Sequence, residues 1–186
     1  MLSLSEEDRR AILVVARQGV FHAVRHGWPI ASYPRTGVFA EHCGLFVTLH
    51  VAGKLRGCIG IIDAHSTLGE NLAHCSADAA LHDPRFPPMR MEELEHLNIE
   101  VSVLSAIQPI RPEDVEIGRH GLLIERGRHR GLLLPQVASE HHLSREQFLD
   151  ETCRKAGLPR DAWKEPGVML FGFECLLIVE KESAAG

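Results

Sequence analysis

The chain has 186 residues, with 20 Lys and Arg against 25 Asp and Glu, so its formal net charge is −5 when histidine is neutral. Hydrophobic residues make up 45% of it and charged residues 24%, a composition that is typical of globular domains and excludes disordered and fibrous chains. No apolar run approaches the roughly 18 residues that cross a bilayer, the charged N-terminus does not resemble a secretory signal, and no long basic block favours general nucleic-acid binding. We therefore expect a single cytosolic domain over residues 1–186, without a membrane segment.

The N-terminal segment predicts a helix. Ser5 and Asp8 can form a capping box, apolar residues recur behind them at helical spacing, and Gly27 ends the pattern. The segment around Pro34 and Gly37 is then expected to be a loop.

Residues 45–51 and 55–62 are two short apolar runs separated by three residues, and they predict a β-hairpin. Because side chains alternate between the two faces of a strand, pairing Val51 with Leu55 collects apolar residues on one face. The other face then carries His50 opposite Arg56, Thr48 opposite Cys58 and Phe46 opposite Gly60.

The middle of the chain predicts a second helix and a third strand. Thr67 and Glu70 begin the helix, which stops near Asp83 because Pro84 disfavours helical geometry in the residue before it. Residues 97–104 alternate between apolar and polar side chains, as a half-buried strand does.

The C-terminal part predicts another hairpin, a helix and a last strand. Residues 121–125 and 131–134 flank an arginine-rich tip, Ser144 and Gln147 begin a helix, and Gly157 ends it. The last strand spans residues 168–180 and places six apolar side chains on one side, namely Met169, Phe171, Phe173, Cys175, Leu177 and Val179. Because strands and helices alternate irregularly, we predict an α+β fold with a mainly antiparallel or mixed sheet and flanking helices.

Cys58 is the strongest candidate for chemistry. Gly57 and Gly60 beside it weaken a strand, and one interpretation is that they leave the thiol sterically open. A neighbouring cation such as Arg56, with His50 across the hairpin, would then favour the nucleophilic thiolate. The other interpretation is that the glycines only let another element pack closely while Cys58 fills the gap. Cys75, Cys153 and Cys175 are expected to be small core residues.

Other polar clusters carry weaker predictions. His22 and His26 are four residues apart on the first helix, but no third ligand is identifiable, so we predict no metal site. The tip from Arg126 to Arg130 holds three arginines that can bind phosphate, RNA or an acidic partner, but it lacks aromatic neighbours and is more simply a solvated turn. The sequence does not identify a cofactor.

Five segments of the chain resemble the AMMECR domain family. They are residues 55–60 (Leu55 to Gly60), 83–88 (Asp83 to Pro88), 99–105 (Ile99 to Ser105), 131–138 (Gly131 to Ala138) and 152–158 (Thr152 to Leu158). The resemblance covers nearly the whole chain. It implies an α+β domain in two unequal lobes with a cleft between them, near which residues 55–60 lie, and it brings no established reaction. Bacterial members resemble protein A of the AmmeMemoRadiSam set, which implies a Memo-like protein and a radical SAM enzyme as partners.

Three functional hypotheses follow. In the first, the chain is an enzyme or enzyme component that binds a small molecule in the inter-lobe cleft, with Cys58 as nucleophile or covalent carrier, Arg56 as its anion-binding neighbour and His50 as base. The candidate substrate-binding residues are Thr48, Gly57, Gly60 and Arg85. In the second, the chain is a non-catalytic adaptor that docks the two partners or a ribonucleoprotein, with Arg128 and Arg130 at the contact. RNA binding through the arginine tip is a weaker third possibility.

Overall fold

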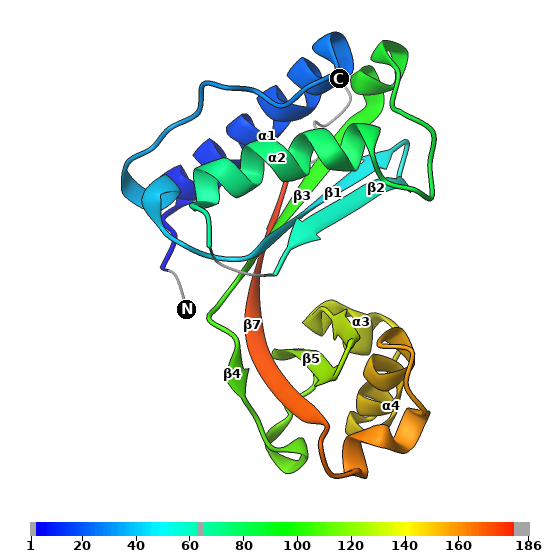
Figure 1. Ribbon diagram of the computed structural model, residues 1–186. Coiled ribbons are helices and arrows are strands. Elements are labelled where there is room, and N and C mark those ends of the chain that lie inside the picture. Colours follow the sequence, from blue (N-terminus) through cyan, green and yellow to red (C-terminus); the bar gives the residue numbers. More distant parts are fainter. Residues whose placement is uncertain (1–2, 63–64, 181–186) are drawn as a thin grey trace. The chain divides into compact units, whose positions relative to one another are not determined.

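The computed structural model describes residues 3–62 and 65–180. The chain divides into two compact units (Figure 1). The larger unit comprises the described residues up to Val103 together with 176–180, and the smaller unit comprises residues 104–175. Helices and an antiparallel sheet confirm the predicted α+β class.

The larger unit packs two helices on one side of a sheet. Its elements in chain order are α1 (Glu6–His26), η1 (Gly37–Ala40), β1 (Leu45–Val51), β2 (Lys54–Ile61), α2 (Leu68–Leu81), η2 (Met91–His96) and β3 (Leu97–Leu104), followed by the end of β7 (Met169–Val179). The strand order is β2-β1-β3, with β7 next to β3, and β1 is antiparallel to both of its neighbours. β2 is therefore an edge strand.

Local signals fix the two helices where the sequence predicts them. Ser5 and Asp8 form the capping box of α1, and Gly27 closes it with a φ of 87°, a value that glycine adopts without strain. The Thr67 side chain accepts a hydrogen bond from the backbone N–H of Glu70 at the start of α2. That helix ends at Leu81, two residues before the predicted limit.

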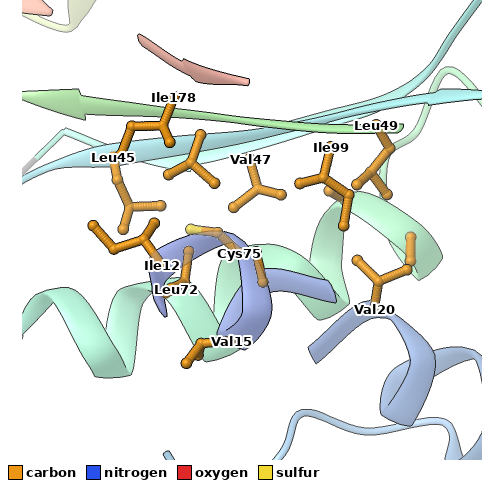
Figure 2. Packing of buried hydrophobic residues seen from close by; sticks show 14 of the residues in the cluster. Ile12, Val15, Val20, Leu45, Val47, Leu49, Leu72, Cys75, Ile99 and Ile178 are labelled. Atoms are coloured by element: carbon orange, nitrogen blue, oxygen red, sulfur yellow. The ribbon is translucent and has the colours of Figure 1, made fainter. Parts of the chain in front are cut away.

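The core of the larger unit lies between these helices and the sheet. Leu45, Val47 and Leu49 of β1 are fully buried, because alternate residues of the strand face the helices. Figure 2 shows them packed against residues of α1 and α2, with side chains of β3 and β7 beside them, namely Ile12, Val15, Val20, Leu72, Cys75, Ile99 and Ile178.

The smaller unit packs helices on a second antiparallel group of strands. Its elements are β4 (Gln108–Pro109), η3 (Pro112–Asp114), β5 (His120–Arg126), β6 (His129–Leu133), α3 (Pro135–Glu140), α4 (Arg145–Lys155), η4 (Arg160–Lys164) and the first part of β7. β5 pairs with β6 and β7, and β4 pairs with β7. Buried residues of β5 and α4 form its core, among them Leu122, Ile124, Phe148, Leu149 and Cys153.

The predicted register of the first hairpin is confirmed along most of its length and wrong near the turn. Thr48 lies opposite Cys58 and Leu49 opposite Gly57, but His50 then lies opposite Leu55 instead of Arg56. The turn contains two residues, Ala52 with φ 48° and Gly53 with φ 73°, and this pair of positive values is what a tight two-residue hairpin requires. Arg56 is the additional residue of β2 at this point, so the register shifts between Leu49 and His50.

The last strand forms over Met169–Val179, but of the six apolar residues on its predicted side only Phe173 is buried. Leu177 is 41% exposed and Val179 45%, whereas Ile178 between them is 3% exposed and belongs to the core of the larger unit. Cys175 is half-buried, so it is not the core residue that was expected. No helix among residues 3–62 and 65–180 is long and apolar enough to span a membrane.

Candidate active site around Cys58

Cys58 lies on the edge strand with its side chain beside Thr48 of β1. The Thr48 Oγ1 hydroxyl donates a hydrogen bond to the Cys58 Sγ at 3.3 Å. The backbone N–H of Cys58 points away from β1, toward Asp83, so Thr48 and Cys58 form the type of antiparallel pair whose side chains approach most closely. Cys58 is half-buried.

Asp83 and Arg85 take the place of a neighbouring strand along Cys58. The backbone N–H of Cys58 donates to Asp83 Oδ2 at 2.8 Å, and Arg85 Nη2 donates to the backbone carbonyl of Cys58 at 3.4 Å. Both outward backbone groups of this edge residue are thus satisfied by side chains from the segment after α2. Hydrogen bonds therefore hold both the N–H and the C=O group of Cys58.

Asp83 and Arg85 also bind each other. Arg85 Nε and Nη2 donate to the two carboxylate oxygens of Asp83 at 3.0 and 2.7 Å. The hydrogen bond from Arg85 holds the pKa of Asp83 well below its usual range, against the opposing effect of burial, and backbone hydrogen bonds from Cys58 and Arg85 add to the lowering. The hydrogen bond to Asp83 in turn raises the pKa of Arg85, and the Cys58 thiol adds to this increase. Arg85 is therefore a cation beside the sulfur.

Arg56 has a different partner from the one predicted. Its Nε and Nη2 donate to Glu93 at 2.6 and 3.1 Å, and the hydrogen bond from Arg56 is the largest cause of the lowered pKa of Glu93. The guanidinium groups of Arg56 and Arg85 lie 5.8 and 5.5 Å from the centre of the Phe86 ring. Two cations thus share one aromatic side chain, which favours guanidinium groups at its faces.

His50 lies on the same face of β1 as Thr48, two residues further along. Its Nδ1 is 3.7 Å from Glu100 Oε1 on β3. Within the described part of the chain, no hydrogen bond joins His50 to Cys58. The predicted role of His50 as base is therefore not supported by a direct contact, and it stays a prediction.

The two glycines beside Cys58 serve packing. A Cβ atom on Gly57 would lie 2.0 Å from the backbone oxygen of Ala79, so α2 passes directly against this residue. A Cβ on Gly60 would lie 2.2 Å from the Phe46 ring. The interpretation of close packing is therefore correct for Gly57 and Gly60. The exposure of the thiol follows from the position of Cys58 itself, which is half-buried.

The remaining polar candidates are placed elsewhere. Cys43 and Cys75 are buried, and burial raises their thiol pKa values to about 11 and about 12. At the arginine tip, Arg126 binds Glu165 at 2.6 Å and Arg130 binds Glu125 at 2.8 Å. No group of three metal-ligating side chains is found among the described residues.

Three residues of this site, Asp83, Glu93 and Glu100, were not identified as site residues from the sequence. Asp83 begins the segment 83–88 that resembles the AMMECR family, and its burial at 3% exposure is unusual for a carboxylate. An Asp directly after a predicted helix and two residues before an Arg is a signal for such a pair. Glu93 and Glu100 give no comparable signal, because they reach the site only through the tertiary fold.

Comparison with known proteins identifies a family and several similar chains. The sequence model of the AMMECR1 family matches residues 13–178. A protein of Methanosarcina acetivorans is 46% identical over 151 residues, which cover 78% of this chain and 75% of that protein. A protein of Methanothermobacter thermautotrophicus is 39% identical over 186 residues, which cover 95% of this chain and 96% of the other. The crystal structure of the uncharacterized protein PH0010 from Pyrococcus horikoshii matches with a TM-score of 0.87 and 34% identity, over 96% of this chain and 94% of that one.

Proposed function

This chain belongs to the AMMECR1 family, and from that premise we propose that Cys58 is the nucleophile of a site that binds a small anionic molecule. The observation that carries the proposal is a half-buried thiol that accepts a hydrogen bond from Thr48 and has the Arg85 cation beside it. A hydroxyl donor and a cation both stabilise negative charge that develops on sulfur.

The preference for an anion rests on the two guanidinium groups at Phe86. Arg56 and Arg85 each use Nε and Nη2 to bind a carboxylate. Among the described residues, no hydrogen-bond partner of either Nη1 is found, so these two NH₂ groups can bind a ligand. Arginine recognises carboxylate and phosphate groups through such N–H groups. The side chain of Arg85 is 53% exposed, which leaves it accessible from solvent.

In this proposal, the Cys58 sulfur adds to a carbonyl carbon of the bound molecule, and the C=O π bond breaks so that its electron pair moves to the carbonyl oxygen. The thiol proton passes to His50 through a water molecule, and Glu100 Oε1 lies 3.7 Å from His50 Nδ1. Asp83 holds the backbone of Cys58 and orients Arg85, so it is a positioning residue.

Alkylation with a neutral and an anionic reagent tests the proposal. Iodoacetamide should modify Cys58 before the other cysteines at neutral pH, and the ratio of iodoacetate to iodoacetamide rates should exceed the ratio for free glutathione. Thr48→Val should slow Cys58 modification by about fivefold, the effect of one lost hydrogen bond, and Thr48→Ser should restore it. Mass spectrometry of tryptic peptides measures each rate by position.

The Arg85→Gln variant separates anion binding from thiol accessibility. It should reduce the iodoacetate rate more than the iodoacetamide rate, whereas Arg85→Lys should retain most of the preference. A Cys58 that reacts no faster than glutathione, with the same reagent ratio, would contradict the proposal. The adaptor hypothesis predicts instead that a Cys58→Ser variant still co-purifies with its partners. It also predicts that changes at Arg128 and Arg130 abolish this co-purification.

A further inference from the structure

The smaller unit contains a hollow of about 360 Å³ that none of the residues around Cys58 lines. This volume lies at the lower end of the range of small-molecule sites, about 300–1,000 Å³. The hollow lies beside β4, β5 and β7, and its lining combines apolar and polar residues, namely Ser105, Ala106, Gln108, Pro109, Ile110, His120, Gly172, Phe173 and Glu174.

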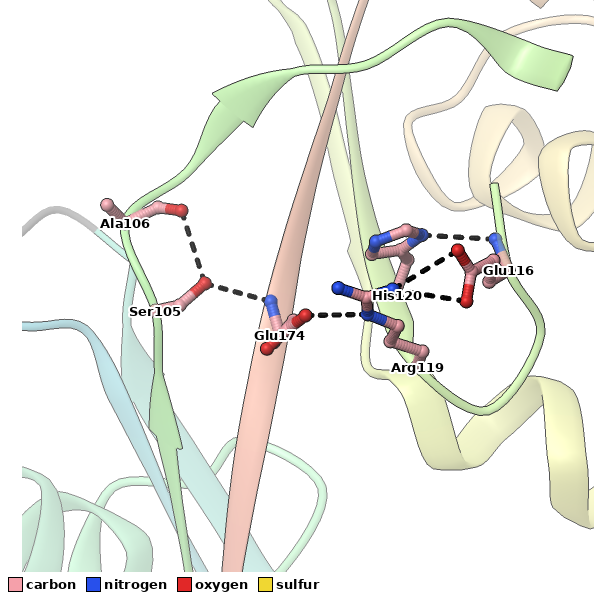
Figure 3. A network of polar contacts seen from close by, with 6 residues as sticks. All are labelled: Ser105, Ala106, Glu116, Arg119, His120 and Glu174. Atoms are coloured by element: carbon pink, nitrogen blue, oxygen red, sulfur yellow. Dashed lines mark hydrogen bonds and ion pairs between the residues drawn. The ribbon is translucent and has the colours of Figure 1, made fainter. Parts of the chain in front are cut away.

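His120 presents a hydrogen-bond donor at this hollow. Its Nδ1 accepts a hydrogen bond from the backbone N–H of Glu116 at 3.0 Å, as Figure 3 shows. A backbone N–H can only donate, so the neutral imidazole carries its proton on Nε2. In the part of the chain that the structure describes, Nε2 has no hydrogen-bond partner. Its N–H group is therefore available to a ligand.

Glu174 presents an acceptor next to this donor. It is the direct cross-strand partner of His120 in the β5–β7 ladder, so the two side chains leave the same face of the sheet with Cβ atoms about 5 Å apart. Arg119 Nε donates to Glu174 Oε1 at 2.7 Å, and this bond is the largest cause of the lowered pKa of Glu174. Glu174 is thus a carboxylate, which only accepts hydrogen bonds. No partner of Oε2 is found among the described residues.

Both groups are held in place before any ligand binds. The backbone N–H of Glu174 donates to Ser105 Oγ at 2.9 Å, and the backbone N–H of Ser105 donates to the carbonyl of Glu174 at 2.9 Å. Arg119 is bound in turn by the two oxygens of Glu116 at 3.2 and 3.3 Å. Figure 3 shows this chain of contacts from Ser105 through Glu174 and Arg119 to Glu116. A fixed donor and acceptor lose little entropy on binding.

We propose that the hollow binds a planar heterocycle through a cyclic amide edge, whose carbonyl accepts from His120 Nε2 and whose adjacent N–H donates to Glu174. Guanine and uracil are the common heterocycles with such an edge. Pro109 and Ile110 supply the apolar surface for the ring. Glu174, Arg119 and Glu116 together carry one excess negative charge, so the site disfavours the anionic molecules proposed for the Cys58 site.

Binding of guanosine and uridine to the full chain, measured by isothermal titration calorimetry, tests this proposal. The matched ligands are 1-methylguanosine and 3-methyluridine, in which a methyl group replaces the donor hydrogen. Each methylated nucleoside should bind at least about tenfold more weakly than its parent, the effect of losing a hydrogen bond to a charged group. The two parent nucleosides show whether the hollow prefers the larger or the smaller ring.

Variants separate this site from the rest of the chain. Glu174→Gln should weaken parent binding by about tenfold, while Glu165→Gln, which removes an exposed carboxylate of the same unit, should not. The Cys58→Ala variant should bind the nucleosides as the native chain does, because Cys58 does not line the hollow. If the nucleosides do not bind, the proposal for Cys58 is therefore unaffected. Equal binding of methylated and parent nucleosides overturns the proposal, as does the absence of binding by both parents at millimolar concentration. The methylated ligands keep the test valid even where a variant is unstable.

Discussion

At the scale of single residues, Asp83 holds the backbone of Cys58 and the side chain of Arg85 at the same time. Asp83→Asn removes the charge and at least one of these hydrogen bonds from a position that is only 3% exposed. We expect it to lower the free energy of unfolding by about 2 kcal/mol, less than for a fully buried ion pair because the Arg85 side chain is half in solvent. Urea unfolding monitored by circular dichroism measures this loss.

Asp78→Asn is the matched control for that substitution. Asp78 pairs with His82 at 2.8 Å on the surface of α2, and the two side chains are 44% and 63% exposed, so its loss should change the free energy of unfolding by less than about 0.5 kcal/mol. Equal effects of the two substitutions would show that Asp83 has no special structural role.

The residues of the Cys58 site differ in how far the sequence predicts them. Thr48 is found beside Cys58 because strand periodicity fixes which side chains face each other across a short hairpin. The predicted pair of His50 and Arg56 is wrong because one irregularity in the ladder shifts every pair beyond it. Glu93 binds Arg56 across 37 residues of chain, and no local pattern encodes that distance.

At the scale of elements, the contact between β2 and α2 depends on Gly57. A Cβ atom there would lie 2.0 Å from the backbone oxygen of Ala79, and a helix backbone cannot rotate away as a side chain does. Gly57→Ala should therefore lower the free energy of unfolding by about 3 kcal/mol, because α2 must shift from the sheet. The midpoint of urea unfolding measures the change.

Gly53→Ala controls for the loss of glycine itself. Gly53 has a φ of 73° in the hairpin turn, and nothing lies within 4 Å of an added Cβ, so the cost is only the positive φ, about 1 kcal/mol. If Gly57→Ala costs no more than Gly53→Ala, close packing of α2 is not the reason for glycine at position 57.

The elements that the sequence predicts well are those with local signals. Capping boxes mark the starts of α1 and α4, and alternation marks β3. β4 has two residues and α3 has six, and both are too short for a periodic pattern. The covered side of β7 also escapes prediction, because Ile178 is buried only where α1 and β3 supply neighbours.

At the scale of the whole molecule, each compact unit has its own apolar core and its own ion pairs. Asp83 and Glu93 bind arginines in the larger unit, and Glu174 and Asp114 do so in the smaller one. Both units therefore depend on ionised carboxylates, although their cores differ in extent.

Acid should consequently destabilise the molecule below about pH 4. The pKa values of Asp83, Glu93, Asp114 and Glu174 are lowered in the folded chain, with a hydrogen bond from arginine as the largest cause in each case. A carboxyl group whose pKa is lower in the folded than in the unfolded chain adds stability above its unfolded value, about 4, and loses it as pH falls through the folded value. The free energy of unfolding in urea should thus decrease between about pH 6 and about pH 3. Because Asp83→Asn lacks the most strongly shifted of these groups, its deficit relative to the native chain should be smaller at the lower pH. A stability that does not change with pH, or a deficit that stays constant, would contradict this linkage.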